Sequence, residues 1–120
     1  MRPRFSVPAD VRNVYNADCD CRVVLNLLAD KWSALALGAL QDGPVRFGAV
    51  KAKLGGISPK VLTAVLRRLE DNELITRTVY PEVPLRVEYE LTELGRDAFV
   101  PLAGLIRWVE GNIERFPAPS

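Results

Sequence analysis

The sequence of 120 residues contains no histidine. Histidine is the commonest general base and the only side chain that titrates near neutral pH without a perturbed environment. Its absence removes most zinc sites and most nucleophile–base pairs of hydrolases. The chain also lacks a glycine-rich phosphate loop with a lysine, and paired carboxylates among apolar neighbours. We therefore expect a protein that is not an enzyme and that uses no metal or cofactor.

Long apolar runs are missing as well, and no stretch approaches the roughly 20 residues that span a bilayer. The N-terminus lacks the basic and then apolar layout of a signal peptide. Apolar residues nevertheless make up 48% of the chain, which predicts one globular domain with a real core. We expect a soluble cytoplasmic protein that does not bind membranes.

Cysteine is scarce, and its two copies, Cys19 and Cys21, are two positions apart. Structural disulfides are rare in the cytoplasm, and so close a pair is awkward to bridge, so no disulfide between them is expected. Three states stay open: packed idle thiols, a redox or electrophile sensor, and metal ligands. Asp18 and Asp20 disfavour the reactive thiolate of Cys19, opposed only by Arg22.

Acidic residues are absent from residues 43–69, although this window holds six of the sixteen basic residues. The rest of the chain therefore carries ten basic and fifteen acidic groups, a net charge of −5, against +1 for the whole. A positive region on an otherwise negative body is the electrostatic pattern of a nucleic-acid-binding surface.

Residues 58–72 within this window show the pattern of a capped amphipathic helix. Ser58 is a favourable N-cap, and Pro59 suits the first helical position. Apolar residues then recur at three- and four-residue spacing and predict one buried stripe: Leu62, Val65, Leu66 and Leu69. The helix dipole disfavours Lys60 so early, which indicates a partner outside the helix. An ordinary solvated basic face is the alternative.

Shorter helices are expected before it, at residues 23–28, 31–41 and 47–54. Asp30 is the expected N-cap of the second, and Gly43 with Pro44 is expected to end it. A turn at residues 55–56, both glycine, leads into the 58–72 helix. Two helices joined by a short glycine-containing turn form the outline of a helix-turn-helix. Residues 1–18 keep no period and are expected to form an N-terminal arm before a domain at residues 19–116.

After this helix the periodicity changes from helical to alternating. Residues 75–80 (ITRTVY) and 86–91 (RVEYEL) predict two strands, and the two prolines of residues 81–84 (PEVP) predict an exposed hairpin tip. A hairpin after a helix-turn-helix predicts a winged helix. The fold class is thus mainly α with a small β-hairpin (α+β), its wing at about residues 76–91.

A last helix is predicted at residues 93–115, capped by Thr92 and kinked or interrupted by Pro101. Its apolar stripe is longer than a compact head can cover, which predicts a homodimer. The expected interface residues are Leu102, Leu105, Ile106, Val109 and Ile113. The alternative is a stripe that folds back on its own domain. Trp32 and Trp108 are expected in the core.

In order and spacing, the most specific pieces of the sequence are Lys31-Trp32, Ile57-Ser58-Pro59 and the hairpin at residues 81–92 (PEVPLRVEYELT). Together with Cys19, Gly43, Arg46, Gly95 and Trp108, they resemble the HxlR-type transcription regulators, relatives of the MarR group. The resemblance covers roughly residues 19–110. It implies a winged-helix homodimer that binds operator DNA. Some members use a cysteine at the position of Cys19 to sense oxidants or electrophiles.

The expected DNA contacts follow from placing the 58–72 helix in the major groove. Residues expected to face base edges are Ser58, Lys60, Val61, Thr63 and Ala64. Arg67 is expected at a base or a phosphate, and Arg68 at a phosphate. Arg46 and Lys51 are expected on the backbone, and Arg86 of the wing in a minor groove or on its phosphates. A winged helix that binds proteins without specific DNA binding is the rival hypothesis.

Overall fold

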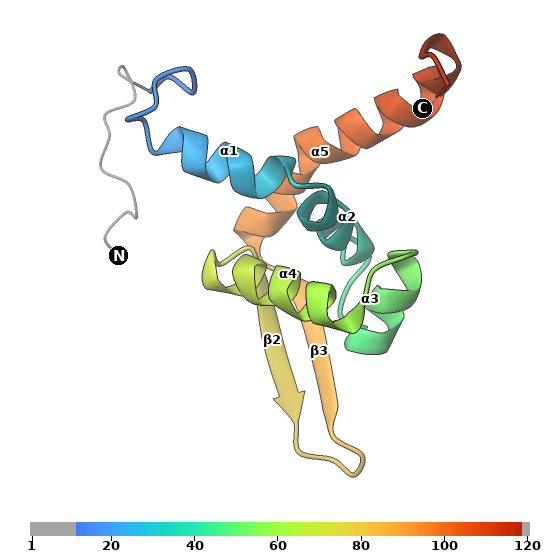
Figure 1. Cartoon of the computed structure of the whole chain (residues 1–120). Coiled ribbons are helices and arrows are strands. Elements are labelled where there is room, and N and C mark those ends of the chain that lie inside the picture. The colour runs from blue at the N-terminus through green and yellow to red at the C-terminus, as the bar shows by residue number, and fades with distance from the viewer. Residues whose placement is uncertain (1–11, 119–120) are drawn as a thin grey trace.

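The computed structural model describes residues 12–118. Nine elements follow one another in this part of the chain (Figure 1): α1 (Cys21–Ala29), α2 (Lys31–Ala39), β1 (Val45–Arg46), α3 (Phe47–Lys53), α4 (Pro59–Asp71), β2 (Ile75–Tyr80), β3 (Arg86–Leu91), α5 (Glu93–Asn112) and a 3-10 turn (Ile113–Arg115). Most of the expected arm, residues 1–11, lies outside the described residues.

The helix-turn-helix is formed by α3 and α4. Gly43 and Gly56 lie before α3 and α4 with φ of 129° and 88°, a left-handed region that glycine enters without a steric penalty. Ser58 caps α4 as predicted, since its side chain accepts a hydrogen bond from the Val61 amide. Asp30 caps α2 in the same way through the Ser33 amide.

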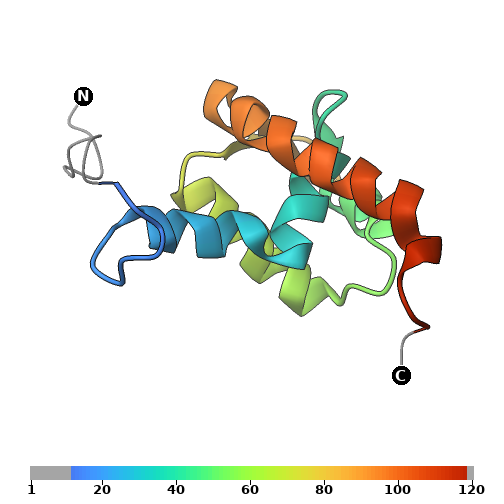
Figure 2. The ribbon, with the colours of Figure 1, turned by 90° about the horizontal axis from the view of Figure 1, so that it is seen from above.

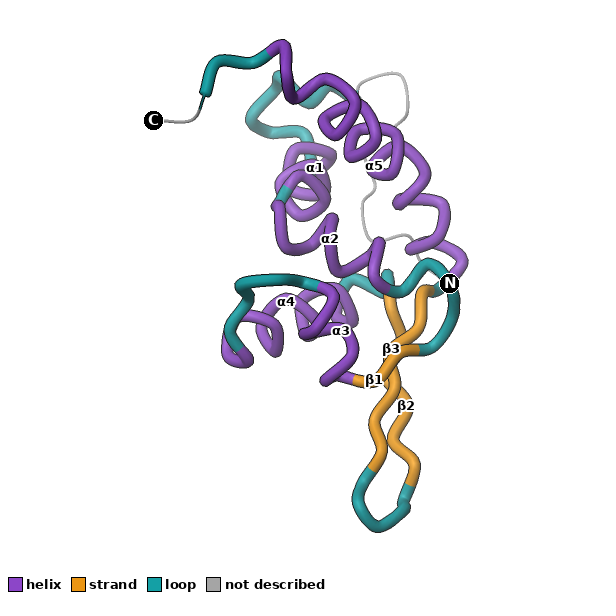
Figure 3. Tube along the Cα trace, turned by 90° about the vertical axis from the view of Figure 1, so that its right-hand side faces the viewer, coloured by secondary structure: helices purple, strands orange, loops and turns teal. Residues whose placement is uncertain are grey.

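The wing is the β2–β3 hairpin, whose strand bounds match the prediction. The sequence analysis missed β1, which adds a third antiparallel strand in the order β1-β3-β2, with Val45 opposite Tyr89. A strand of two residues is too short to leave an alternating pattern. The hairpin projects well past α3 and α4 (Figure 3), so its far end is covered by neither helix.

One core joins the helices to the base of the sheet. Leu37 and Leu40 of α2 and Leu62, Leu66 and Leu69 of α4 are almost fully buried. Ile75 of β2 and Tyr89 and Leu91 of β3 belong to the same cluster. The predicted stripe of α4 therefore faces the core, which turns the opposite side of α4 outward.

Helix α5 begins at a joint with the end of α4. The Thr92 side chain accepts from the Gly95 amide and donates to the Glu73 carbonyl at 2.7 Å, and the Thr92 amide donates to the Leu74 carbonyl at 3.0 Å. A kink or an interruption was predicted at Pro101; the helix is not interrupted there, since α5 runs through Pro101 as one helix. Proline removes one backbone hydrogen bond there, and the packing of α5 on α2 keeps the neighbouring turns helical.

At the end of the fold opposite the wing, α1 and the C-terminal half of α5 are not fully covered by other elements. Seen from above in Figure 2, α5 crosses the molecule, and its C-terminal half extends away from the wing (Figure 1). Helix α1 contains no fully buried residue. Among the described residues, no helix is long and apolar enough to cross a membrane.

Candidate nucleic-acid interface

The outward side of α4 carries the predicted DNA-binding residues. With 3.6 residues per turn, Lys60, Ala64, Arg67 and Asp71 recur on the side opposite the buried leucines. Seven of the predicted residues at α4 are exposed: Ser58, Lys60, Val61, Thr63, Ala64, Arg67 and Arg68. The Thr63 hydroxyl donates to the Pro59 carbonyl at 2.8 Å, which fixes its orientation at the start of the helix.

The two basic residues on this side, Lys60 and Arg67, outnumber its one acidic residue, Asp71. Within residues 12–118, Lys60 and Arg67 form no ion pair. The positive end of the helix dipole adds to these charges, so positive potential is concentrated along the first turns of α4. This arrangement suits an extended anionic ligand that lies along the helix, such as a nucleic acid whose groove admits α4.

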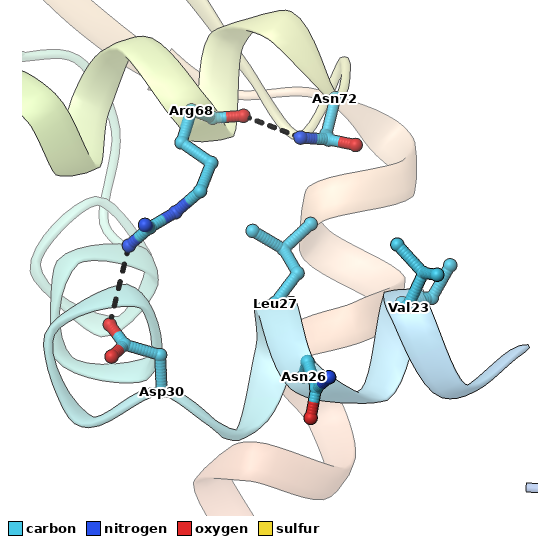
Figure 4. Close-up of a pocket in the computed structure, with 7 residues that line it drawn as sticks. Val23, Asn26, Leu27, Asp30, Arg68 and Asn72 are labelled. Carbon is cyan, nitrogen blue, oxygen red and sulfur yellow. Dashed lines mark hydrogen bonds and ion pairs between the residues drawn. The ribbon is translucent and has the colours of Figure 1, made fainter. Parts of the chain in front are cut away.

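Arg68 does not share this orientation, and its expected phosphate contact stays a prediction. Its guanidinium lies 3.5 Å from the Asp30 carboxylate and 3.5 Å from the Ser33 hydroxyl, at the junction of α1 and α2 (Figure 4). On the helix, Arg68 lies one position past Arg67, so its side chain turns toward α1. The charge of Arg68 is therefore paired within the chain.

Arg68 also lines a groove between α1 and α4 with a volume of about 310 Å³. Its other walls are Val23, Val24, Asn26, Leu27, Asp30 and Asn72 (Figure 4). Neither tryptophan lines this groove. Trp32 is partly buried against the core, while Trp108 is 50% exposed on α5, so the prediction of a core position was wrong for Trp108.

The basic residues before α4 have different surroundings. Arg46 is exposed, and the pairing of β1 with β3 places it opposite Glu88. Lys51 is half-buried on α3 and forms no ion pair in the described part of the chain. Lys53 donates to the Ala39 carbonyl at 3.2 Å and so closes the C-terminal end of α2.

The Arg86 side chain is held in place by other residues of the wing. Its guanidinium pairs with Glu82 at 2.9 Å and 3.1 Å and with Glu88 at 2.9 Å, and lies 3.7 Å from the ring centre of Tyr80. Hydrogen bonding to Glu82 is the largest effect on the pKa of Arg86 and raises it; desolvation, the next largest, lowers it, and the charge of Glu82 and the contacts with Glu88 raise it, so the pKa lies above its ordinary value. The predicted DNA contact therefore concerns a side chain whose charge is already compensated.

Arg77 was overlooked in the sequence analysis. It lies exposed on β2 and forms no ion pair with any described residue. The alternation of residues 75–80, which predicted the strand, already placed Arg77 on the same face as Ile75.

The cysteines contradict the sequence prediction. Cys19 and Cys21 are joined by a disulfide, with their Cα atoms 5.4 Å apart. Asp20 between them has helical φ and ψ, so the chain turns there, whereas an extended chain would separate the two Cα atoms by about 7 Å. The measured separation falls within the range of ordinary disulfides. Cys19 is buried, and the bond lies at the first turn of α1.

Apolar side chains remain uncovered along the C-terminal half of α5. Leu105, Val109 and Ile113 are 58%, 43% and 60% exposed, and Trp108 and Phe116 form an edge-to-face pair at 5.8 Å beside them. Leu102 and Ile106, also predicted at a dimer interface, pack partly on the chain's own core. The first half of this stripe thus folds back on its own domain, as the alternative expected, and the second half is open; the homodimer stays a prediction.

Comparison with known proteins agrees with this architecture. The family model described as HxlR-like helix-turn-helix matches residues 27–116. The chain belongs to the HxlR-like family of transcriptional regulators. The fold expected from the HxlR resemblance, a winged helix-turn-helix with a small antiparallel sheet, is confirmed.

Individual relatives of this HxlR-like chain are similar over most of its length. The uncharacterized regulator YtfH of Escherichia coli is 39% identical over 101 residues, which cover 84% of this chain and 80% of YtfH. The structure of the transcriptional regulator ytfH from Salmonella typhimurium has a TM-score of 0.81 and 38% identity, covering 87% of this chain and 93% of that one. The redox regulator HypR in its oxidized form has a TM-score of 0.73 and 33% identity, covering 78% and 97%.

Proposed function

We propose that the protein is a homodimeric, cytoplasmic transcription regulator, not an enzyme, that binds double-stranded operator DNA with α4 in the major groove. The observation that carries this proposal is the unpaired Lys60 and Arg67 on the outward side of a helix whose other side is buried. A major groove is wide enough to admit one helix. The N-terminal half of α4 meets base edges through Ser58, Lys60, Val61, Thr63 and Ala64. Arg67 meets a base or a phosphate, and Arg46 and Lys51 meet the backbone.

A gel-shift titration against DNA from upstream of the protein's own coding sequence tests this assignment. Lys60→Ala is expected to weaken specific binding more than non-specific binding, since a base contact discriminates by about 1–3 kcal/mol. Arg46→Ala is expected to weaken both alike and to reduce the salt dependence. Weak binding that does not change with salt would favour the rival role, a protein-interaction module.

The homodimer rests on the open half of α5. A small soluble domain rarely leaves a row of large apolar side chains exposed, and a two-fold axis covers the same patch on both copies. Leu105→Glu is expected to halve the mass measured by light scattering. The matched control is Val100→Glu, which places the same charge on the other side of α5 at a residue 68% exposed. Equal masses for both variants and the wild type would contradict this interface.

Thiol-based control is the remaining part of the proposal. It is supported by the Cys19–Cys21 disulfide at the start of α1 and by the similarity to the redox regulator HypR. Oxidation of the two thiols gives the disulfide, while two electrons and two protons pass to the oxidant. Operator affinity is measured before and after reduction and after diamide, with Cys19→Ser alongside. If affinity never changes and Cys19→Ser behaves like the wild type, the cysteines are not a sensor.

A further inference from the structure

The two faces of the wing hairpin differ in charge. Side chains of paired residues in an antiparallel ladder point to the same face. Ile75, Arg77 and Val79 pair with Leu91, Tyr89 and Val87, and these six form what we call the inner face. The remaining paired residues form the outer face: Thr76, Thr78 and Tyr80 with Glu90, Glu88 and Arg86. Arg46 of β1 also belongs to the outer face, because it pairs with Glu88.

The inner face is the one that meets the helices. Ile75, Tyr89 and Leu91 are buried in the cluster that contains the α4 leucines. Beyond this contact the hairpin continues past α4 (Figures 1 and 3), so the far part of the inner face is open. Val79 is 43% exposed there. A duplex that lies along the outward side of α4 and reaches the wing therefore meets the inner face.

Arg77 is the only charged residue among the six that form the inner face. It is exposed, and it has no acidic partner within residues 12–118. The outer face carries Glu88 and Glu90, and Glu82 at the tip binds Arg86. Glu82, Arg86 and Glu88 together carry a net charge of −1, so this cluster offers no free positive charge to a phosphate. The cation of the outer face that has no ion pair within residues 12–118 is Arg46 of β1.

We propose that Arg77 is the cation through which the wing contacts DNA phosphate, and that Arg86 is a positioning residue that holds the hairpin tip. This inference rests on the proposed DNA binding and replaces the expected role of Arg86. The bidentate pair with Glu82, the pair with Glu88 and the stacking on Tyr80 fix Arg86 through the planar shape of its guanidinium. Arg77 needs only its charge.

Arginine-to-lysine replacements separate these two roles. A phosphate contact survives as a point charge, so Arg77→Lys should bind DNA as the wild type does, while Arg77→Ala should not. A lysine at position 86 cannot keep both the bidentate pair with Glu82 and the stacking on Tyr80. Arg86→Lys should therefore lower the melting temperature of the free protein and leave the salt dependence of DNA binding unchanged. Arg107→Ala, an exposed position on α5, controls for the loss of one positive charge.

The readout is the slope of log affinity against log salt concentration for a duplex from upstream of the coding sequence. Each released phosphate contact contributes about 0.9 to this slope, so a dimer that loses two contacts changes it by about 1.8. When salt rises from 50 to 200 mM, both proteins lose affinity. The factor by which the wild type loses affinity should be about ten times the factor for Arg77→Ala.

Three results would overturn the inference, and they are distinguishable from one another. If the wild type binds with a steep slope and Arg77→Ala keeps it, Arg77 makes no phosphate contact. If Arg86→Ala, and not Arg77→Ala, lowers the slope, the roles are reversed. If the wild type shows no salt-dependent binding while Lys60→Ala is equally inert, the proposed DNA binding fails and this inference fails with it.

Discussion

Replacing Gly95 with alanine should destabilise the joint between the end of α4 and the start of α5. A Cβ at this position would overlap the carbonyl oxygen of Leu74, lie 2.9 Å from its carbonyl carbon and lie 3.3 Å from a methyl of Leu91. The first two groups are backbone, so no rotamer change relieves the overlap. The start of α5 has to move away from the end of α4.

The magnitude follows from the bonds that this movement breaks. The Thr92 amide would lose its hydrogen bond to Leu74, worth about 1 kcal/mol net. The N-cap between Thr92 and the Gly95 amide would weaken, at a further cost of about 1 kcal/mol. The free energy of unfolding should fall by about 2–3 kcal/mol, which lowers the melting temperature by about 10 °C for a chain of this size.

Thermal unfolding followed by circular dichroism measures this loss, with all samples at one protein concentration because a dimer's melting temperature depends on it. Gly111→Ala is the matched control, since it lies on the same helix with no atom within 4 Å of the added Cβ. It should raise stability by up to about 1 kcal/mol through helix propensity. If the melting temperature of Gly95→Ala is no lower than that of Gly111→Ala, the start of α5 does not approach the Leu74 backbone as closely as the structure indicates.

Three further changes test other parts of the fold. Ser58→Ala should lower the free energy of unfolding in urea by about 1 kcal/mol, because the Val61 amide loses its acceptor, whereas Ser58→Asp should keep the cap. Equal stability of the two variants would exclude the cap. Glu73→Gly should be neutral or stabilise by up to about 1 kcal/mol, since Glu73 has φ of 60°, and a clear loss of stability would refute that backbone conformation. Thiol titration of unfolded, unreduced protein should find no free thiol and, after reduction, both cysteines; two thiols before reduction would exclude the disulfide.

Features that depend on neighbouring residues were predictable from the sequence. The caps at Ser58, Asp30 and Thr92 join side chains to amides three residues on, so residue type and position were enough. The strands of the wing were found because their alternation is local and proline marks the tip between them. The exposed residues of α4 followed from the same helical period that placed the leucines in the core.

Features that depend on distant residues were missed or wrong. The pair between Arg68 and Asp30 joins residues on α4 and at the α1–α2 junction, and no local pattern records it. The ion pair between Arg86 and Glu82 depends on where the turn at the hairpin tip places Glu82. No disulfide was expected from the cellular compartment and the sequence spacing, while the helical backbone at Asp20 decides the distance. An interruption at Pro101 was one of two predicted outcomes, beside a kink, because propensity does not include the packing of α5 on α2.

The most direct test of α4 in a major groove is protection of guanine N7 from methylation by dimethyl sulfate. This atom lies in the major groove, so an inserted helix shields it. If the wild type binds its operator as the proposed homodimer, we predict two groups of protected guanines about one helical turn, roughly 34 Å, apart. Both groups should weaken in Lys60→Ala and Arg67→Ala and persist in Arg107→Ala. Full methylation at a bound site, or protection that these α4 variants leave unchanged, would contradict the account.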